Sequence, residues 1–113
     1  MLIRSQNKEV LTNLNALAGI EIAEGPVKTV ITSYITGCSY LLGEYSNKQK
    51  AAKVLDMLQK AHAEYEMLRG MSTGMGGIMV TYNTKMIVNE LEKEIQEKTI
   101  FQMPEDSEVE VND

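Results

Sequence analysis

The sequence predicts an α+β fold, in which an antiparallel β-meander of about five strands is followed by two α-helices. Residues 1–45 form short runs rich in β-branched and aromatic side chains, joined by short connections. From residue 46 onward, apolar residues recur at steps of three and four, which is the period of an α-helix. Since strands and helices do not alternate as in parallel α/β folds, we expect neighbouring strands to run antiparallel.

Five segments carry the strand pattern, and the fourth is the clearest because β-branched residues fill both of its faces. Turn-forming pairs, Gly25-Pro26 and Gly37-Cys38, bound this strand. A further β-prone stretch, 99–103, ends at Pro104 and would either add an edge strand or clamp the sheet. The five predicted strands are 2–4, 10–14, 20–23, 27–35 and 40–45.

Two helices are expected in the second half of the chain. A capping box, in which Ser46 accepts from the amide of Gln49, would begin the first helix. Its apolar positions continue to Arg69, and Gly70 would end it. Three glycines between Met71 and Gly77 predict an irregular loop, after which a second helix would begin near Asn83 or Thr84.

The chain of 113 residues is expected to form a single α+β domain over 1–104, with an acidic, disordered tail over 105–113. The sequence holds 16 acidic and 11 basic residues, and the excess of five acids equals the five acids that follow Pro104. A solvated chain end is the simplest interpretation of such a tail. The alternative is a nucleic-acid mimic or a lure for a basic partner protein.

Composition argues against several classes of protein. One cysteine and one histidine, Cys38 and His62, allow neither an intramolecular disulfide nor a two-histidine metal site. No apolar run approaches the roughly 20 residues of a membrane-spanning helix. Basic residues are scattered among acidic ones, which disfavours direct binding of duplex nucleic acid. We therefore expect no metal, no cofactor and no membrane partner.

The glycine-rich segment is the first candidate for ligand binding. Successive glycines let backbone amides converge on an anion, and Ser72, Thr73 and Gly74 would contribute hydroxyl and amide donors. The segment lacks the lysine of a phosphate-binding P-loop and the preceding strand of a dinucleotide-binding turn. A plain connector between two helices is the alternative interpretation.

Five further residues complete the predicted ligand site. Tyr82, Asn83 and Lys85 offer a stacking ring, an amide and a cation at a helix start, whereas a packed tyrosine beside an N-cap is the structural alternative. Arg4 suits a phosphate or carboxylate, or simply points to solvent. Phe101, the single phenylalanine, is either a core residue or a stacking platform.

No catalytic constellation is visible, and we expect that the protein is not an enzyme. No serine or cysteine has a recognisable base partner in the sequence. His62 falls on the apolar side of the first helix, where a packed histidine is the ordinary case. The acidic residues of the helices are spaced as on solvated helix faces.

Three segments resemble a family of small proteins common in phages and integrated elements of Bacillus- and Clostridium-like bacteria. They are Ile3–Lys8, then Leu42–Ser46 running into Lys50–Met57, and finally Phe101–Asp106. Within that group, the outline of an antiparallel sheet followed by two helices resembles the first Thoeris anti-defence family. That resemblance implies a phage sponge that sequesters, uncleaved, the cyclic ADP-ribose isomers of bacterial TIR proteins, and in some members cyclic oligonucleotides.

The resulting expectation is a non-enzymatic anti-defence protein that binds cyclic nucleotide signals in the cytoplasm of an infected bacterial host. A homo-oligomer, either a dimer or a hexamer, would pool the few donors of each chain. The alternative is a protein-binding inhibitor of a bacterial defence nuclease, similar in role to an anti-CRISPR protein. It would use the acidic tail or a surface of methionines, a side chain common at adaptable interfaces: Met57, Met67, Met71, Met75, Met79 and Met86.

Overall fold

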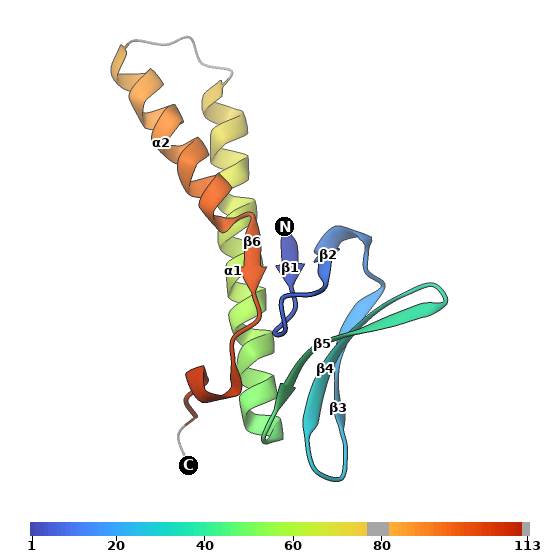
Figure 1. Cartoon of the computed structure of the whole chain (residues 1–113). Helices are drawn as coiled ribbons and strands as arrows, with labels where there is room; N and C mark the ends of the chain where they lie inside the picture. The colour runs from blue at the N-terminus through green and yellow to red at the C-terminus, as the bar shows by residue number, and fades with distance from the viewer. Residues whose placement is uncertain (77–81, 112–113) are drawn as a thin grey trace.

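A computed structural model describes residues 1–76 and 82–111, except for the side chains of 72–76 and 82–88. Figure 1 shows strands packed against the first half of one long helix, α1, whose second half pairs with α2 and projects away from them. The α+β class is therefore confirmed. The described elements are β1 (Leu2–Arg4), β2 (Leu11–Asn13), β3 (Gly19–Glu24), β4 (Thr29–Ile35), β5 (Cys38–Tyr45), α1 (Lys48–Gly76), α2 (Tyr82–Lys98) and β6 (Ile100–Gln102).

The strands form two three-stranded sheets, ordered β2-β1-β6 and β3-β4-β5, instead of the single meander expected from the sequence. A 3₁₀ turn at Leu14–Ala16, capped by the Asn13 side chain, separates β2 from β3. The β3-β4-β5 sheet is antiparallel throughout. In the other sheet β1 pairs antiparallel with β2 and parallel with β6. The β-prone stretch before Pro104 thus adds an edge strand, which was one of its two predicted roles.

The core lies where one face of the β3-β4-β5 sheet and the strand β1 meet the first half of α1. Strand β4 shows the predicted alternation, because Thr29, Ile31 and Ser33 are all buried on one face. Helix α1 contributes residues up to Leu58 to this core, with Ala61 and Tyr65 packed against it. The buried core residues are Met1, Ile3, Ile31, Leu42, Tyr45, Ala51, Val54, Leu58, Met103 and Val109.

Helix α1 departs from the prediction at both ends. Its N-cap is Asn47, whose Oδ1 accepts from the amide of Lys50 at 2.8 Å, and not Ser46. It does not stop at Gly70 but continues to Gly76, for 29 residues. A helical glycine costs about 1 kcal/mol relative to alanine and does not by itself break a helix. Packing against α2 outweighs that cost, so the expected loop over 71–76 is wrong.

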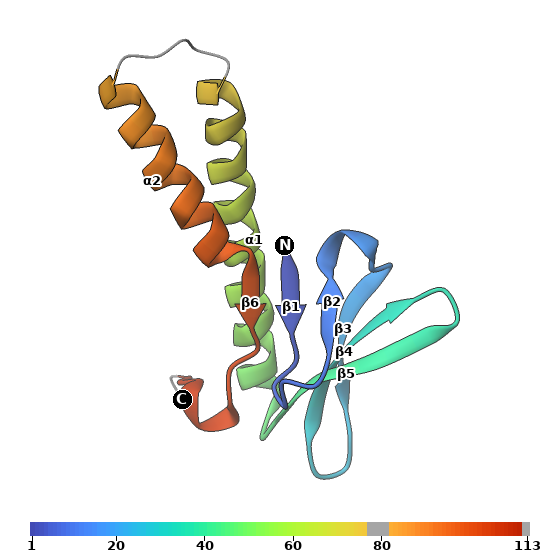
Figure 2. The same cartoon turned by 45° about the horizontal axis from the view of Figure 1, so that its top comes forward.

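The outer part of the α1–α2 hairpin, residues 66–76 and 82–97, is called the arm below. It projects beyond the strands in both views (Figures 1 and 2). The radius of gyration is 17.1 Å, whereas a compact chain of this length would have about 13 Å. Leu68 and Leu91 are buried within the arm, but neither belongs to the core cluster. The arm is therefore a separate packing unit attached to the core.

The side chain of Gln6 joins the two sheets and the C-terminal segment. Its Oε1 accepts from the amide of Glu44 at 2.9 Å, and its Nε2 donates to the carbonyls of Glu44 at 3.1 Å and Pro104 at 3.2 Å. The backbone amide of Gln6 donates to the carbonyl of Leu42 at 2.7 Å. Gln6 thus hydrogen-bonds to the backbone of Leu42 and Glu44 along the edge of β5, as a neighbouring strand would.

The acidic segment after Pro104, for which the sequence predicts a disordered tail, packs against the domain over the described residues 105–111. Asp106 begins a 3₁₀ turn and accepts from the amide of Ser46 at 2.8 Å. Val109 is only 3% exposed and belongs to the core. Lys53 donates to the carbonyl of Glu110. Val109 is an apolar residue within this acidic segment, and its burial in the core fixes the segment to the domain.

We predict that Gln6→Leu lowers the free energy of unfolding by about 2–4 kcal/mol, because it leaves the backbone N–H and C=O of Glu44 without their partner and removes one of the two donors to the carbonyl of Pro104. Chemical denaturation monitored by circular dichroism measures this change. Gln59→Leu, the same replacement at an exposed position of α1, is the matched control and should change stability little. Equal effects of the two variants would contradict the proposed role of Gln6.

We predict that Val109→Ala costs about 2 kcal/mol of stability, the range for removing buried methyl groups. Val27→Ala is the control, since Val27 is 83% exposed. Thermal unfolding of both variants beside the parent chain measures the difference. If the two melt together, the tail does not pack against the core in solution.

Candidate functional site

Six of the predicted ligand residues lie at the outer end of the arm. Ser72, Thr73 and Gly74 belong to the last two turns of α1 and not to a loop. Tyr82, Asn83 and Lys85 form the first turn of α2, which begins one residue before the earliest predicted start. The hairpin brings these two helix ends to the same end of the molecule (Figure 1). Their side chains, and the connection at 77–81, lie outside the described residues.

Arg4 and Phe101 lie on the β2-β1-β6 sheet, far from the end of the arm. The 17 residues of α2 separate Phe101 from Tyr82, which is roughly 25 Å at 1.5 Å per residue. Phe101 pairs in register with Ile3, whereas Arg4 pairs with Gln102, so they occupy opposite faces of the sheet. The Nε of Arg4 donates to the carbonyl of Lys8. One chain therefore does not assemble all eight predicted residues into one site.

Phe101 packs against the core, which is one of the two roles predicted for it, and it also lines a pocket at the base of the arm. This pocket has a volume of about 190 Å³. Glu64 of α1 and Lys98 of α2 form an ion pair of 3.2 Å at its edge. Glu97 adds a second carboxylate, so the pocket is not suited to a phosphate. Its lining residues are Ala61, Glu64, Glu97, Lys98, Ile100 and Phe101.

A cavity of about 430 Å³ lies at the junction of Gln6, Tyr45 and the acidic segment. Glu44, Glu105 and Asp106 line it, against a single cation, Lys28. The Nζ of Lys28 is already paired with Glu44 at 3.0 Å. Excess negative charge makes this cavity unfavourable for a nucleotide phosphate.

An apolar groove of about 280 Å³ lies between α1 and the start of β3. His62 lines the groove, and its buried Nδ1 has no hydrogen-bond partner among the described residues. The sequence predicted a packed histidine here, and the structure places it half-buried at the groove. The other lining residues are Leu14, Leu17, Gly19, Ile20, Leu55, Leu58 and Gln59.

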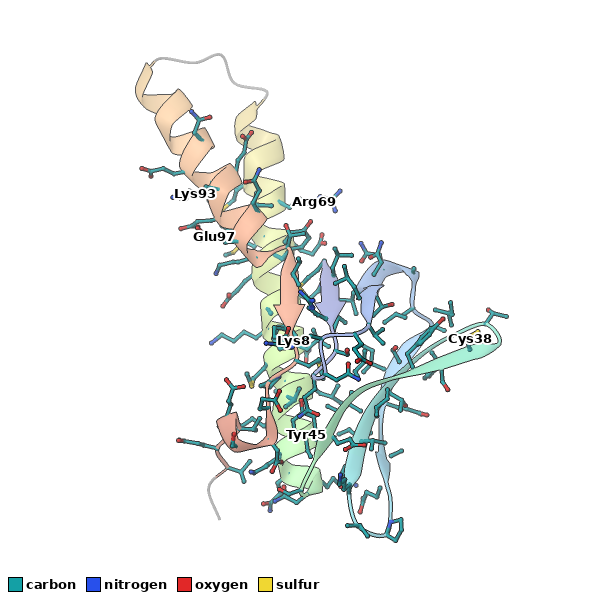
Figure 3. The ribbon with its side chains drawn as sticks, viewed as in Figure 1. Lys8, Cys38, Tyr45, Arg69, Lys93 and Glu97 are labelled. Atoms are coloured by element: carbon teal, nitrogen blue, oxygen red, sulfur yellow. The ribbon has the colours of Figure 1, made fainter. Side chains whose placement is uncertain are left out.

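Two titratable groups at the junction have shifted pKa values. Hydrogen bonds from the amide and hydroxyl of Ser46, together with the Lys50 ammonium, hold the pKa of Asp106 below its usual value. Burial raises the pKa of Tyr45, and the nearby acidic segment adds to the effect. The Tyr45 hydroxyl donates to the carbonyl of Pro104 at 2.8 Å. Figure 3 shows Tyr45 where β5 approaches α1. Both pKa shifts arise from the contacts that hold residues 105–111 against the domain.

No motif in the sequence marks this junction. Gln6 and Ser46 are polar residues in short segments, and their partners Pro104 and Asp106 lie about 60 to 100 positions away in sequence. The one available hint was the set of segments on which the family resemblance rests, since Gln6, Glu44, Ser46 and Asp106 all belong to them.

No protein-family model, curated protein or solved structure matches this chain. Among the described residues, no helix is long and apolar enough to cross a membrane. Within the same part of the chain, no group of three or more His, Cys, Asp or Glu side chains is placed to hold a metal ion.

We predict that stability depends on the ionisation of Asp106. Because its folded pKa is lowered, its contribution is present above the usual carboxyl pKa of about 3.9 and is lost as the pH falls through the folded value. Asp106→Asn should be less stable than the parent near neutral pH, and the difference should shrink below about pH 4. Denaturant unfolding as a function of pH, with Glu90→Gln as the exposed control, measures it. A difference that is constant with pH would contradict the assignment.

Proposed function

We propose that this protein is a non-enzymatic binder that sequesters cyclic nucleotide signals, such as cyclic ADP-ribose isomers, at the end of its arm. The observation that carries the proposal is the position of the arm end. Two segments separated in sequence, Ser72–Gly74 and Tyr82–Lys85, reach it together. In the family that the sequence resembles, such binding counters the bacterial host's immune signalling, and the same role in the host cytoplasm is proposed for this chain.

The chemistry of a helix start supports an anionic ligand at this end. The first turn of α2 begins at Tyr82, and the amides of a first turn have no partners within their own helix. Those amides, with the positive end of the helix dipole, favour phosphate. Tyr82 and Asn83 are the residue types that stack on a base and hydrogen-bond its edge, and Lys85 adds a cation. The cavities of the strand-rich part offer a phosphate no comparable environment.

The independence of the arm from the core also supports a binding role. Among the side chains that the structure describes, the buried core cluster contains none from α2 and none from α1 beyond Leu58. Stability of the strand-rich part therefore does not account for the extra length of α1 and α2. A projecting hairpin of this kind is well placed to meet a ligand or a second chain, and the proposed binder is a homo-oligomer.

A second candidate function is inhibition of a host defence protein through direct contact. It is favoured by the exposure of Met67 and Met71, which are 60% and 49% accessible on the flank of the arm. Its other proposed element, the acidic tail, is tied to Ser46, Lys50 and the core over the residues described. Truncation at Pro104 would therefore remove core contacts and cannot separate the two candidates cleanly.

We predict that Tyr82→Ala weakens binding of the cyclic nucleotide ten- to a hundredfold, since a stacked base contributes about 1–3 kcal/mol. Native mass spectrometry against cyclic ADP-ribose isomers and cyclic dinucleotides identifies the ligand, and calorimetric titration measures the affinity. Tyr40→Ala is the matched control, because Tyr40 is exposed on β5, away from the arm. Unchanged affinity of folded Tyr82→Ala would move the site elsewhere, and a blank panel would favour the inhibitor.

A further inference from the structure

Strand β3 is an edge strand with one open side. In the order β3-β4-β5 it pairs only with β4. The amide of Gly25 donates to the carbonyl of Lys28 at 2.8 Å, and in an antiparallel pair such hydrogen-bonded positions recur at every second residue. The residues between them direct their backbone N–H and C=O groups away from β4. Within β3 these residues are Ile20, Ile22 and Glu24.

The backbone groups on this open side are unpaired. Among the described residues, none donates to or accepts from the backbone of Ile20, Ile22 or Glu24. The opposite edge of the same sheet is covered, because Gln6 hydrogen-bonds to the backbone of Leu42 and Glu44 on β5. Figure 1 shows the end of the β3–β4 hairpin clear of both helices. A row of unpaired N–H and C=O groups is the template on which a further strand pairs.

An apolar groove lies on the α1 side of the same strand. Ile20 and Ile22 pair in register with Ser33 and Ile31 of β4, whose side chains are buried on that side. The groove of about 280 Å³ begins at Ile20 and is lined by Leu55 of α1. A strand added to β3 would direct every second side chain toward α1. The groove therefore favours an added strand with apolar residues at alternate positions.

Glu21 gives the other face of this edge a negative charge. Its side chain is exposed on the face opposite to Ile20 and Ile22, and within the described part of the chain it has no ion pair. Its neighbour across β4 is the uncharged Thr32. A lysine or arginine beside Glu21 on an added strand would be a favourable cross-strand pair. Pairing with β3 of a second copy would instead add two more glutamates, which disfavours self-association at this edge.

We propose that β3 binds an extended peptide segment of a partner protein, which joins the sheet as a further strand. The segment carries apolar side chains toward α1 and the groove, and a lysine or arginine on the other face, beside Glu21. The open backbone groups of β3 provide affinity for any extended chain, whereas the groove and Glu21 provide selectivity. This surface belongs to the strand-rich part of the molecule, so the inference goes beyond the binding proposed at the arm end and does not rest on it.

Amide hydrogen exchange with a model peptide tests the strand pairing. The probe is Thr-Val-Lys-Leu-Lys-Val-Thr with blocked ends, which matches the six residues of β3, roughly 20 Å at 3.3 Å per residue. We expect the amides of Ile20, Ile22 and Glu24 to become protected when the probe is added, whereas those of Glu21 and Ala23, which face β4, are protected throughout. Unchanged exchange of the three outward amides would overturn the proposal. Their protection in the free protein would assign the edge to a second copy instead.

Backbone methylation of the probe separates strand pairing from attraction between side chains. One probe is N-methylated at the three apolar residues and another at the two lysines, so that side chains and charges stay the same. Because alternate amides of a strand point to opposite sides, only one of the two sets faces β3. We expect one methylated probe to bind and the other to fail in fluorescence anisotropy. Equal affinity of the two methylated probes would overturn the strand pairing.

The central leucine of the probe tests the groove. Its replacement by serine keeps the backbone and the charges, and should weaken binding roughly tenfold, because a buried leucine side chain is lost from an apolar environment. Replacement of a terminal threonine by serine is the matched control and should change the affinity little. Equal affinity of the leucine and serine probes would show that the apolar side chain does not enter the groove.

Charge reversal tests the role of Glu21. Glu21→Lys should weaken binding of the lysine probe about fivefold, and should strengthen binding of the matching probe Thr-Val-Glu-Leu-Glu-Val-Thr. Glu66→Lys makes the same change of net charge at an exposed position of α1, and should leave the preference for lysine intact. A Glu21→Lys chain that prefers the lysine probe as strongly as the parent would overturn the proposed selectivity for a basic segment.

Discussion

The pairing of the Gln6 side chain with the backbone of Glu44 and Pro104 is the contact on which the strand-rich part of the molecule depends. Neither three-stranded sheet continues into the other, so the two must be held together by contacts other than a shared ladder. The side-chain amide of Gln6 supplies such contacts, because it hydrogen-bonds to both the backbone N–H and the backbone C=O of Glu44. The same side chain also holds the carbonyl of Pro104. Removing it would leave partly buried backbone groups unpaired, which is costly in a protein interior.

The three segments that carry the family resemblance meet at this junction. Gln6 belongs to the first segment, Glu44 and Tyr45 to the second, and Pro104 and Asp106 to the third. Tyr45 also explains the glycine two residues earlier, because its ring lies over Gly43 so closely that a Cβ there would be 2.9 Å from the ring. The resembling residues thus have structural roles. They hold the two ends of the chain against the rest of the domain.

The arm obeys different constraints from the core. Its buried residues, Leu68 and Leu91, lie between two helices only, and a two-layer hairpin leaves one flank of each helix in solvent. Glycines at 70, 74 and 76 would be poor choices for an isolated helix, yet they are helical here because α2 packs alongside. Met67 and Met71 are exposed on the flank of the arm, and methionine is a side chain that packs adaptably where such a surface is covered.

Periodicity and turn chemistry in the sequence determined the fold class, the strand segments and the start of the second helix, because these depend on neighbours a few residues apart. β-Branched residues on both faces of β4 marked it as a strand, whereas the structure showed that the face with Thr29, Ile31 and Ser33 is the buried one. Only the tertiary structure decided what depends on distant contacts. It divided the strands into two sheets, extended α1 past Gly70, and buried Val109 in a segment whose composition predicts disorder. It also separated Phe101 from Tyr82 by the length of α2, because the sequence lists candidate ligand residues but only the path of the helices fixes the distance between them.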